Sequence, residues 1–125
     1  MLTGWTLADP LLSVIVALLI VYAAWGLIAK SAHILLEGAP DGVDPDEIKR
    51  RLVAEVDGVK DVHHFHAWSL TNELPVVTMH AAIEEHADAD QILIDLHKTL
   101  ESVFGLGHAT IQIERGECPD IDYQP

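Results

Sequence analysis

Residues 62–83 read VHHFHAWSLTNELPVVTMHAAI, and this stretch decides the fold of the chain. It contains two apolar-rich runs, VHHFHAWSL over residues 62–70 and PVVTMHAAI over residues 75–83. The segment between them, Thr71-Asn72-Glu73-Leu74, has the polar residues that are typical of a short turn. The sequence therefore predicts two strands joined as a hairpin.

An amphipathic helix is predicted on each side of this hairpin. The first opens at Asp44-Pro45, an N-cap followed by proline at the first helical position, and ends at Gly58. The second covers residues 89–104, and Gly105 closes it. Its predicted buried stripe consists of Ile92, Leu93, Leu96, Leu100 and Val103. Beyond it, HATIQIE over residues 108–114 alternates as a final strand.

The predicted order αββαβ favours a two-layer α+β domain with both helices packed on one face of the sheet. The other sheet face is then open. Strict alternation along the first strand places His64, His66 and Trp68 on one face, and His63 and Phe65 on the other. In the second strand His80 shares its face with Thr78. Polar residues that can bind metal are therefore expected on the open face.

A membrane-spanning helix is predicted ahead of this domain. Residues 10–29, PLLSVIVALLIVYAAWGLIA, carry no charge over a length that matches a bilayer core. A cleaved signal peptide would have its basic residue before the apolar run, whereas Lys30 follows it. By the positive-inside bias, Lys30 and the basic residues 49–51 indicate that the C-terminal part lies in the cytoplasm.

The remainder of the chain is strongly acidic. Positions 1–40 contain two acidic residues, Asp9 and Glu37, and one basic residue, Lys30. Residues 41–125 therefore hold 18 of the 20 acidic and 6 of the 7 basic side chains, which gives this part a formal charge of −12. Such a surface repels phosphate backbones and attracts cations, so nucleic-acid binding is excluded as a role.

Histidines are unusually frequent in the acidic part, which holds seven of the eight, including His63, His64 and His66. Imidazole and carboxylate together form a ligand set that suits Zn²⁺ or a similar divalent ion. The alternative is a group of surface histidines near a sheet edge. The single cysteine, Cys118, is either a fourth ligand as thiolate or a thiol of the tail.

Several motifs in order resemble the cation diffusion facilitator family, specifically its zinc, cobalt and cadmium branch. They are GWTLADPLLS, ILLEGAP, VDGVKDVHHFHAWSLT and HATIQIE, between Gly4 and Cys118. The resemblance implies a last transmembrane helix and linker over residues 1–40 and a cytoplasmic, metallochaperone-like (ferredoxin-like) domain for metal binding and dimerisation over 41–118. Residues 119–125 are expected to be an acidic tail.

The same resemblance implies which residues bind metal. The family's cytoplasmic ligands match His63, His80 and Glu114 of this sequence. His66 completes the VHxxHxW pattern of the family, and His108 lies close to a ligand position of some relatives. The implied metal is Zn²⁺, with Co²⁺ or Cd²⁺ as further candidates.

The resemblance implies that the chain is the C-terminal part of a proton-coupled divalent-cation efflux transporter of the inner membrane, acting as a homodimer. The family's transport ligands lie in its second and fifth spans, which this sequence lacks, so it is expected to be a fragment that transports nothing alone. A free-standing, single-span, membrane-anchored zinc-binding protein is the alternative. A zinc enzyme is not expected, because no catalytic signature is present.

Overall fold

The computed structural model describes residues 8–118, which divide into two compact units between Leu36 and Glu37. The predicted acidic tail, residues 119–125, lies outside the described residues. Each unit has its own architecture, one helical and one of the α+β class.

The first unit contains one helix, α1 (Ala8–Leu35). Its 28 residues span about 42 Å at the usual rise of an α-helix, and its mean hydropathy reaches 2.6. The helix is therefore long and apolar enough to cross a membrane, as predicted from residues 10–29. It begins two residues earlier than that run and continues past Lys30 to Leu35.

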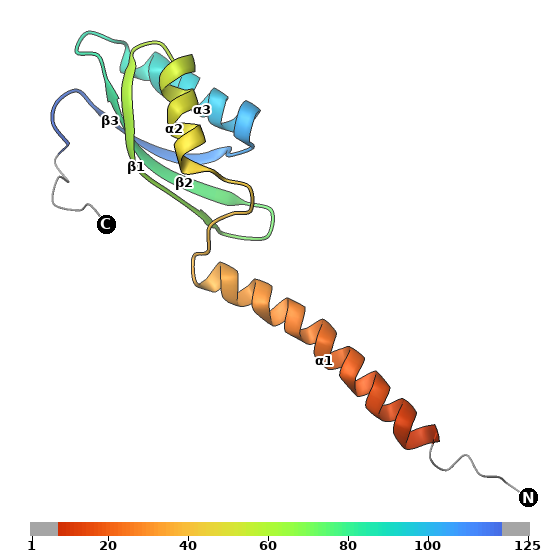
Figure 1. Cartoon of the computed structure of the whole chain (residues 1–125). Helices are drawn as coiled ribbons and strands as arrows, with labels where there is room; N and C mark the ends of the chain where they lie inside the picture. The colour runs from red at the N-terminus through yellow and green to blue at the C-terminus, as the bar shows by residue number, and fades with distance from the viewer. Residues whose placement is uncertain (1–7, 119–125) are drawn as a thin grey trace, which may run out of the picture. The chain divides into compact units, whose positions relative to one another are not determined.

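The second unit has the predicted order of elements. The sheet order is β1-β2-β3; β1 and β2 form an antiparallel hairpin, and β3 returns parallel to β2 after α3 (Figure 1). The elements are α2 (Pro45–Glu55), β1 (Val59–Ser69), β2 (Pro75–Ile83), α3 (Ala89–Phe104) and β3 (His108–Glu114). The sequence prediction of an αββαβ domain is confirmed.

Local side-chain chemistry sets the element boundaries. Asp44 and Asp88 are the N-caps of α2 and α3, and each carboxylate accepts hydrogen bonds from the backbone N–H groups two and three residues further on. Gly105 ends α3 with φ of +68°, a left-handed conformation that glycine adopts without a Cβ clash. In the hairpin loop the Thr71 hydroxyl accepts from the N–H groups of Glu73 and Leu74.

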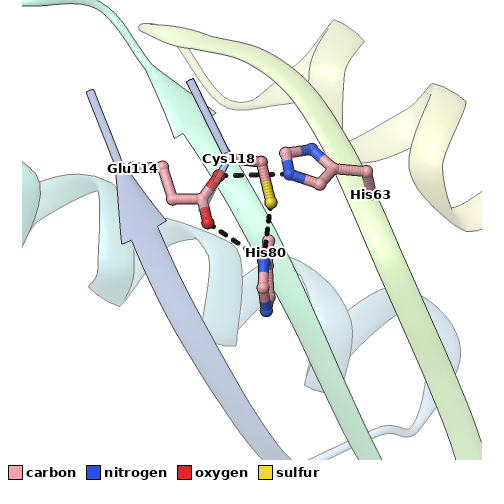
Figure 2. A group of neighbouring side chains, drawn as sticks. All are labelled: His63, His80, Glu114 and Cys118. Atoms are coloured by element: carbon pink, nitrogen blue, oxygen red, sulfur yellow. Dashed lines mark hydrogen bonds and ion pairs between the residues drawn. The ribbon is translucent and has the colours of Figure 1, made fainter. Parts of the chain in front are cut away.

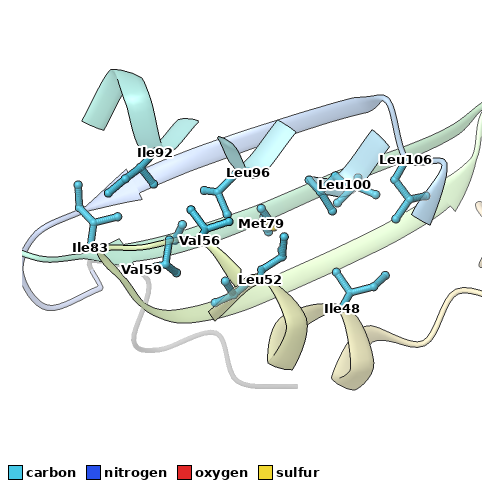
Figure 3. Close-up of a cluster of buried hydrophobic side chains, with 13 residues drawn as sticks. Ile48, Leu52, Val56, Val59, Met79, Ile83, Ile92, Leu96, Leu100 and Leu106 are labelled. Atoms are coloured by element: carbon cyan, nitrogen blue, oxygen red, sulfur yellow. The ribbon is translucent and has the colours of Figure 1, made fainter. Parts of the chain in front are cut away.

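The hydrophobic core lies between the two helices and one face of the sheet (Figure 3). The buried side chains that form it come mainly from α2, α3 and β2, and they are Ile48, Leu52, Val56, Val59, Val62, Val77, Met79, Ala81, Ile83, Ile92, Leu96, Leu100 and Leu106. The prediction that Val103 belongs to the buried stripe is wrong, because its side chain is 42% exposed. It comes in the last turn of α3, three residues after Leu100, and Leu106 beyond the helix is buried in the core instead.

The opposite face of the sheet carries the polar side chains. Since successive residues of a strand point to opposite faces, Thr78, His80 and Ala82 lie on the face opposite to Val77 and Met79. Helices α2 and α3 both pack on the core face (Figures 1 and 3). No helix among the described residues of the second unit covers the face that bears His80, so polar side chains on this face can form a site.

Candidate metal centre

One extra residue in β1 sets the positions of its histidines. His63 pairs with His80 and His66 pairs with Thr78, so three steps along β1 match two steps along β2. This is a β-bulge, and within it His64 has a left-handed backbone with φ of +49°. His63 and His66 both pair with residues of the open face, whereas Phe65 packs against the core. The alternation that grouped His63 with Phe65 is therefore wrong.

Four side chains converge on the open face. His63 comes from β1, His80 from β2, Glu114 from the end of β3, and Cys118 from the segment after β3 (Figure 2). One potential ligand atom from each of them lies within 4.8 Å of the other three. The arrangement joins three strands and the chain beyond the last one in a single cluster.

Glu114 bridges the two imidazoles. Its Oε1 lies 3.0 Å from Nδ1 of His80, and its Oε2 lies 3.1 Å from Nε2 of His63. The same His80 nitrogen lies 3.6 Å from Sγ of Cys118 (Figure 2). The contacts therefore identify which atom of each histidine faces the centre of the cluster.

Glu114 is the buried acidic member, with 7% of its surface exposed. Burial raises the pKa of this carboxyl group, but the hydrogen bond from Gln112, the charges of His80 and His63 and the hydrogen bond of Cys118 outweigh it. The pKa of Glu114 is consequently held below its ordinary value. The Gln112 amide donates to Oε1 over 2.8 Å, so the carboxylate stays ionised and oriented.

The imidazole of His64 packs against this cluster. Its ring stacks on that of His80 with 4.9 Å between centroids and 16° between planes, and it meets the His63 ring edge to face. A left-handed conformation costs a residue other than glycine about 1–2 kcal/mol, with asparagine among the best tolerated. His64 thus combines a strained backbone with a contact to a side chain of the cluster.

Two of the residues that the resemblance associates with metal lie outside this cluster. His66 is exposed and pairs with Thr78. His108 is exposed, pairs with Val76, and precedes Glu114 by six residues of strand, which is roughly 20 Å. Of the five residues proposed from the sequence, the structure brings together His63, His80 and Glu114, and they are joined by Cys118, which the sequence left as either a fourth ligand or a thiol of the tail.

Sequence reasoning missed one neighbour of the cluster, Asp61. Its Oδ2 lies 3.1 Å from Nδ1 of His63. The available signal was an acidic residue two positions before a histidine in a predicted strand, since residues at this spacing share a face.

The donor set fits a zinc-like ion. Two imidazole nitrogens, one carboxylate oxygen and one sulfur are the donor types of tetrahedral zinc sites, and thiolate with imidazole suits Zn²⁺, Co²⁺ or Cd²⁺ better than Mg²⁺ or Ca²⁺. Four protein donors fill a tetrahedral coordination shell. Such a closed set is suited to holding an ion, because a hydrolytic zinc site keeps one position open.

The fold and the site together define a class, a small α+β domain that follows a membrane-length helix and carries a cluster of metal-ligating residue types. Residues 40–116 match the family described as cation efflux protein, cytoplasmic domain. The chain therefore belongs to the cation efflux protein family. This finding confirms the resemblance drawn from the sequence motifs.

Relatives and a solved structure agree with this assignment. The chain is 43% identical over 120 residues to the zinc transporter ZitB of Escherichia coli, and 35% identical over 114 residues to the cadmium, cobalt and zinc/H⁺-K⁺ antiporter of Bacillus subtilis. The matches cover 96% and 89% of this chain, but 38% and 36% of the relatives. The chain thus spans somewhat more than a third of their length.

The solved structure is the metal-bound C-terminal domain of the CzcD transporter from Cupriavidus metallidurans. It is 31% identical to this chain, with a TM-score of 0.54. The match covers all of that domain and 58% of this chain. The α+β fold of the second unit is therefore that of a cation efflux cytoplasmic domain.

The bulge generates a prediction about His64. We expect His64→Val to lower the free energy of unfolding by about 1–2 kcal/mol, because a β-branched side chain is poorly tolerated at positive φ. His64→Asn should stay near wild type, since asparagine tolerates this conformation. Urea unfolding of the metal-free chain in detergent micelles, followed by circular dichroism, measures both. Equal stability of the two variants would show that His64 does not hold a left-handed backbone.

Proposed function

We propose that the second unit binds Zn²⁺, or the similar ions Co²⁺ and Cd²⁺, through His63, His80, Glu114 and Cys118. The observation that carries this proposal is the convergence of four donor atoms within 4.8 Å. The domain then serves as the cytoplasmic metal-binding part of a proton-coupled divalent-cation efflux transporter. The names of the zinc transporter and of the cadmium, cobalt and zinc antiporter among the relatives support this choice of metals.

The electrostatics of the site favour a divalent cation. Glu114 is buried and ionised, and the part of the chain from residue 41 onward carries a formal charge of −12. A bound cation supplies the positive charge that a buried carboxylate needs, and the acidic surface raises the local concentration of cations. The thiol of Cys118 ligates as thiolate, so metal binding releases its proton.

Helix α1 anchors this domain to the inner membrane, with the domain in the cytoplasm. Lys30 and the basic residues 49–51 follow the apolar run, which supports this orientation. Permeation requires polar or ionisable ligands at membrane depth. Residues 10–29 contain no ionisable side chain except Tyr22, so we assign to this chain metal binding and leave permeation to other spans of the transporter.

The domain pairs with a second copy in this proposal, as the family resemblance implies. Two surfaces that each carry about −12 repel one another at neutral pH. Bound divalent cations reduce this charge, so metal binding and dimerisation are linked: an ion that binds the dimer better than the monomer shifts the equilibrium toward the dimer.

Zinc affinity tests the proposed donor set. Replacing His63, His80 and Glu114 together by alanine should weaken zinc binding on the order of 100-fold or more, because only the thiolate of the four donors remains. The measurement is competition with a chromophoric zinc chelator, using the chain in detergent micelles. His86→Ala, which removes an exposed imidazole from the loop after β2, is the matched control and should bind zinc like the wild type.

Equal zinc affinity of the triple variant and the wild type would contradict the proposed site. The wild-type affinity should also fall as the pH is lowered from about 8 to about 5, because protons then compete with the metal for the imidazole nitrogens and for the Cys118 thiolate. Glu114 does not cause this loss, since its lowered pKa keeps it ionised in that range. An affinity that stays constant through this pH range would argue against histidine ligands.

The assembly of the chain tests the proposed link between metal binding and dimerisation. Zinc should increase the dimeric fraction of the wild-type chain in micelles, and it should do so less for the triple alanine variant, which keeps the acidic surface but loses the site. Analytical ultracentrifugation at moderate salt, with and without zinc, measures this fraction. A dimeric fraction that is unaffected by zinc in the wild type would refute the linkage between metal binding and dimerisation.

A further inference from the structure

The imidazole of His63 lies between two carboxylates. Its Nε2 is 3.1 Å from Oε2 of Glu114, inside the cluster, and its Nδ1 is 3.1 Å from Oδ2 of Asp61, outside the cluster. Because a carboxylate oxygen accepts hydrogen bonds, a proton on Nδ1 is donated to Asp61, and a metal ion at Nε2 would leave the single proton of the neutral ring on Nδ1. Each nitrogen of this ring thus has a separate partner.

The backbone explains how Asp61 reaches this position. The ladder between β1 and β2 is regular from Asp61 to His63, where Asp61 pairs with Ala82 and His63 with His80, so these two residues of β1 share the open face. Ala82 pairs in turn with Glu114 of β3. Asp61, Ala82 and Glu114 therefore form one row across the three strands, and the middle residue contributes only a methyl group.

His63 belongs to the row next to that of Asp61, Ala82 and Glu114. His63 pairs with His80, which lies two residues along β2 from Ala82 and therefore in the next row on the same face. Since the small side chain of Ala82 leaves space between the two carboxylates, an imidazole from the next row can contact both of them. The two contacts of 3.1 Å show that the His63 ring does so.

We propose that Asp61 is a positioning residue, which holds the proton on Nδ1 of His63 and thereby makes Nε2 the metal-ligating atom. This inference rests on the metal site proposed above. A neutral imidazole carries one proton, and the nitrogen that carries it cannot ligate a metal. A carboxylate hydrogen bond to the other nitrogen fixes both the tautomer and the ring orientation, and it increases the basicity of the ligating nitrogen.

The geometry separates this role from direct ligation. Asp61 is not a member of the group of donor atoms that lie within 4.8 Å of one another. Its carboxylate contacts the nitrogen of His63 that faces away from Glu114. Because the Asp61 side chain is 65% exposed, water screens its charge, and the expected effect on affinity is at the lower end of what such partners contribute.

Three variants of the chain in detergent micelles test this inference. Asp61→Ala should weaken zinc binding about tenfold, because the hydrogen bond to Nδ1 is lost. Asp61→Asn keeps an acceptor oxygen and should recover most of that affinity. Asp57→Ala removes an exposed carboxylate after α2 and changes the net charge equally, so it measures the effect of charge alone.

The second readout is the ¹⁵N NMR spectrum of the histidine side chains in the zinc-loaded chain, which distinguishes a protonated from a metal-bound ring nitrogen. In the wild type and in Asp61→Asn, His63 should show Nδ1 protonated and Nε2 bound to zinc. In Asp61→Ala the signals of His63 should broaden or report a mixture of both nitrogens as ligands. A purely structural role of Asp61 would leave this pattern unchanged.

The outcomes separate the two proposals. If the wild type binds zinc, but Asp61→Ala matches Asp57→Ala in affinity and keeps the wild-type spectrum, the positioning role is overturned and the metal site stands. If the wild type shows no zinc binding and no zinc-dependent change of its histidine signals, the metal site is wrong and the role of Asp61 is overturned with it.

Discussion

One extra residue in β1 determines which histidines can share a metal ion. Without the bulge between His63 and His66, strict alternation from Trp68 would turn His63 toward the core face. The bulge brings His63 opposite His80, and both then contact the carboxylate of Glu114. The strained backbone of His64 is the local cost of this geometry. The remainder of the site depends on this rearrangement.

A buried carboxylate in an acidic domain is the second constraint on the site. Glu114 is almost completely buried, and its stability as an anion depends on Gln112, His80 and His63. An ionised group that loses such partners is costly inside a protein. A divalent cation interacts with the Glu114 carboxylate more strongly than a neutral imidazole does. The same charge balance explains why cations bound to the domain would reduce repulsion between two copies.

The sequence predicts the order of helices and strands well, because caps, glycines and apolar periodicity act locally in each element. The same local rules cannot predict a bulge at His64, since the pairing with β2 decides it. They also cannot decide whether His108 or Cys118 is the fourth ligand, because the course of the chain after β3 is what brings the Cys118 thiol to His80. His108 instead lies at the opposite end of β3 from Glu114.

X-ray absorption at the zinc K-edge tests the central claim most directly, because it reports the atoms that surround the metal. The account predicts four atoms bound to zinc in the zinc-loaded chain: two imidazole nitrogens and one oxygen at about 2.0–2.2 Å, and one sulfur at about 2.3 Å. The sulfur shell should disappear in Cys118→Ser, whereas the imidazole signal should remain. A spectrum with six oxygen neighbours and no imidazole or sulfur would contradict the account.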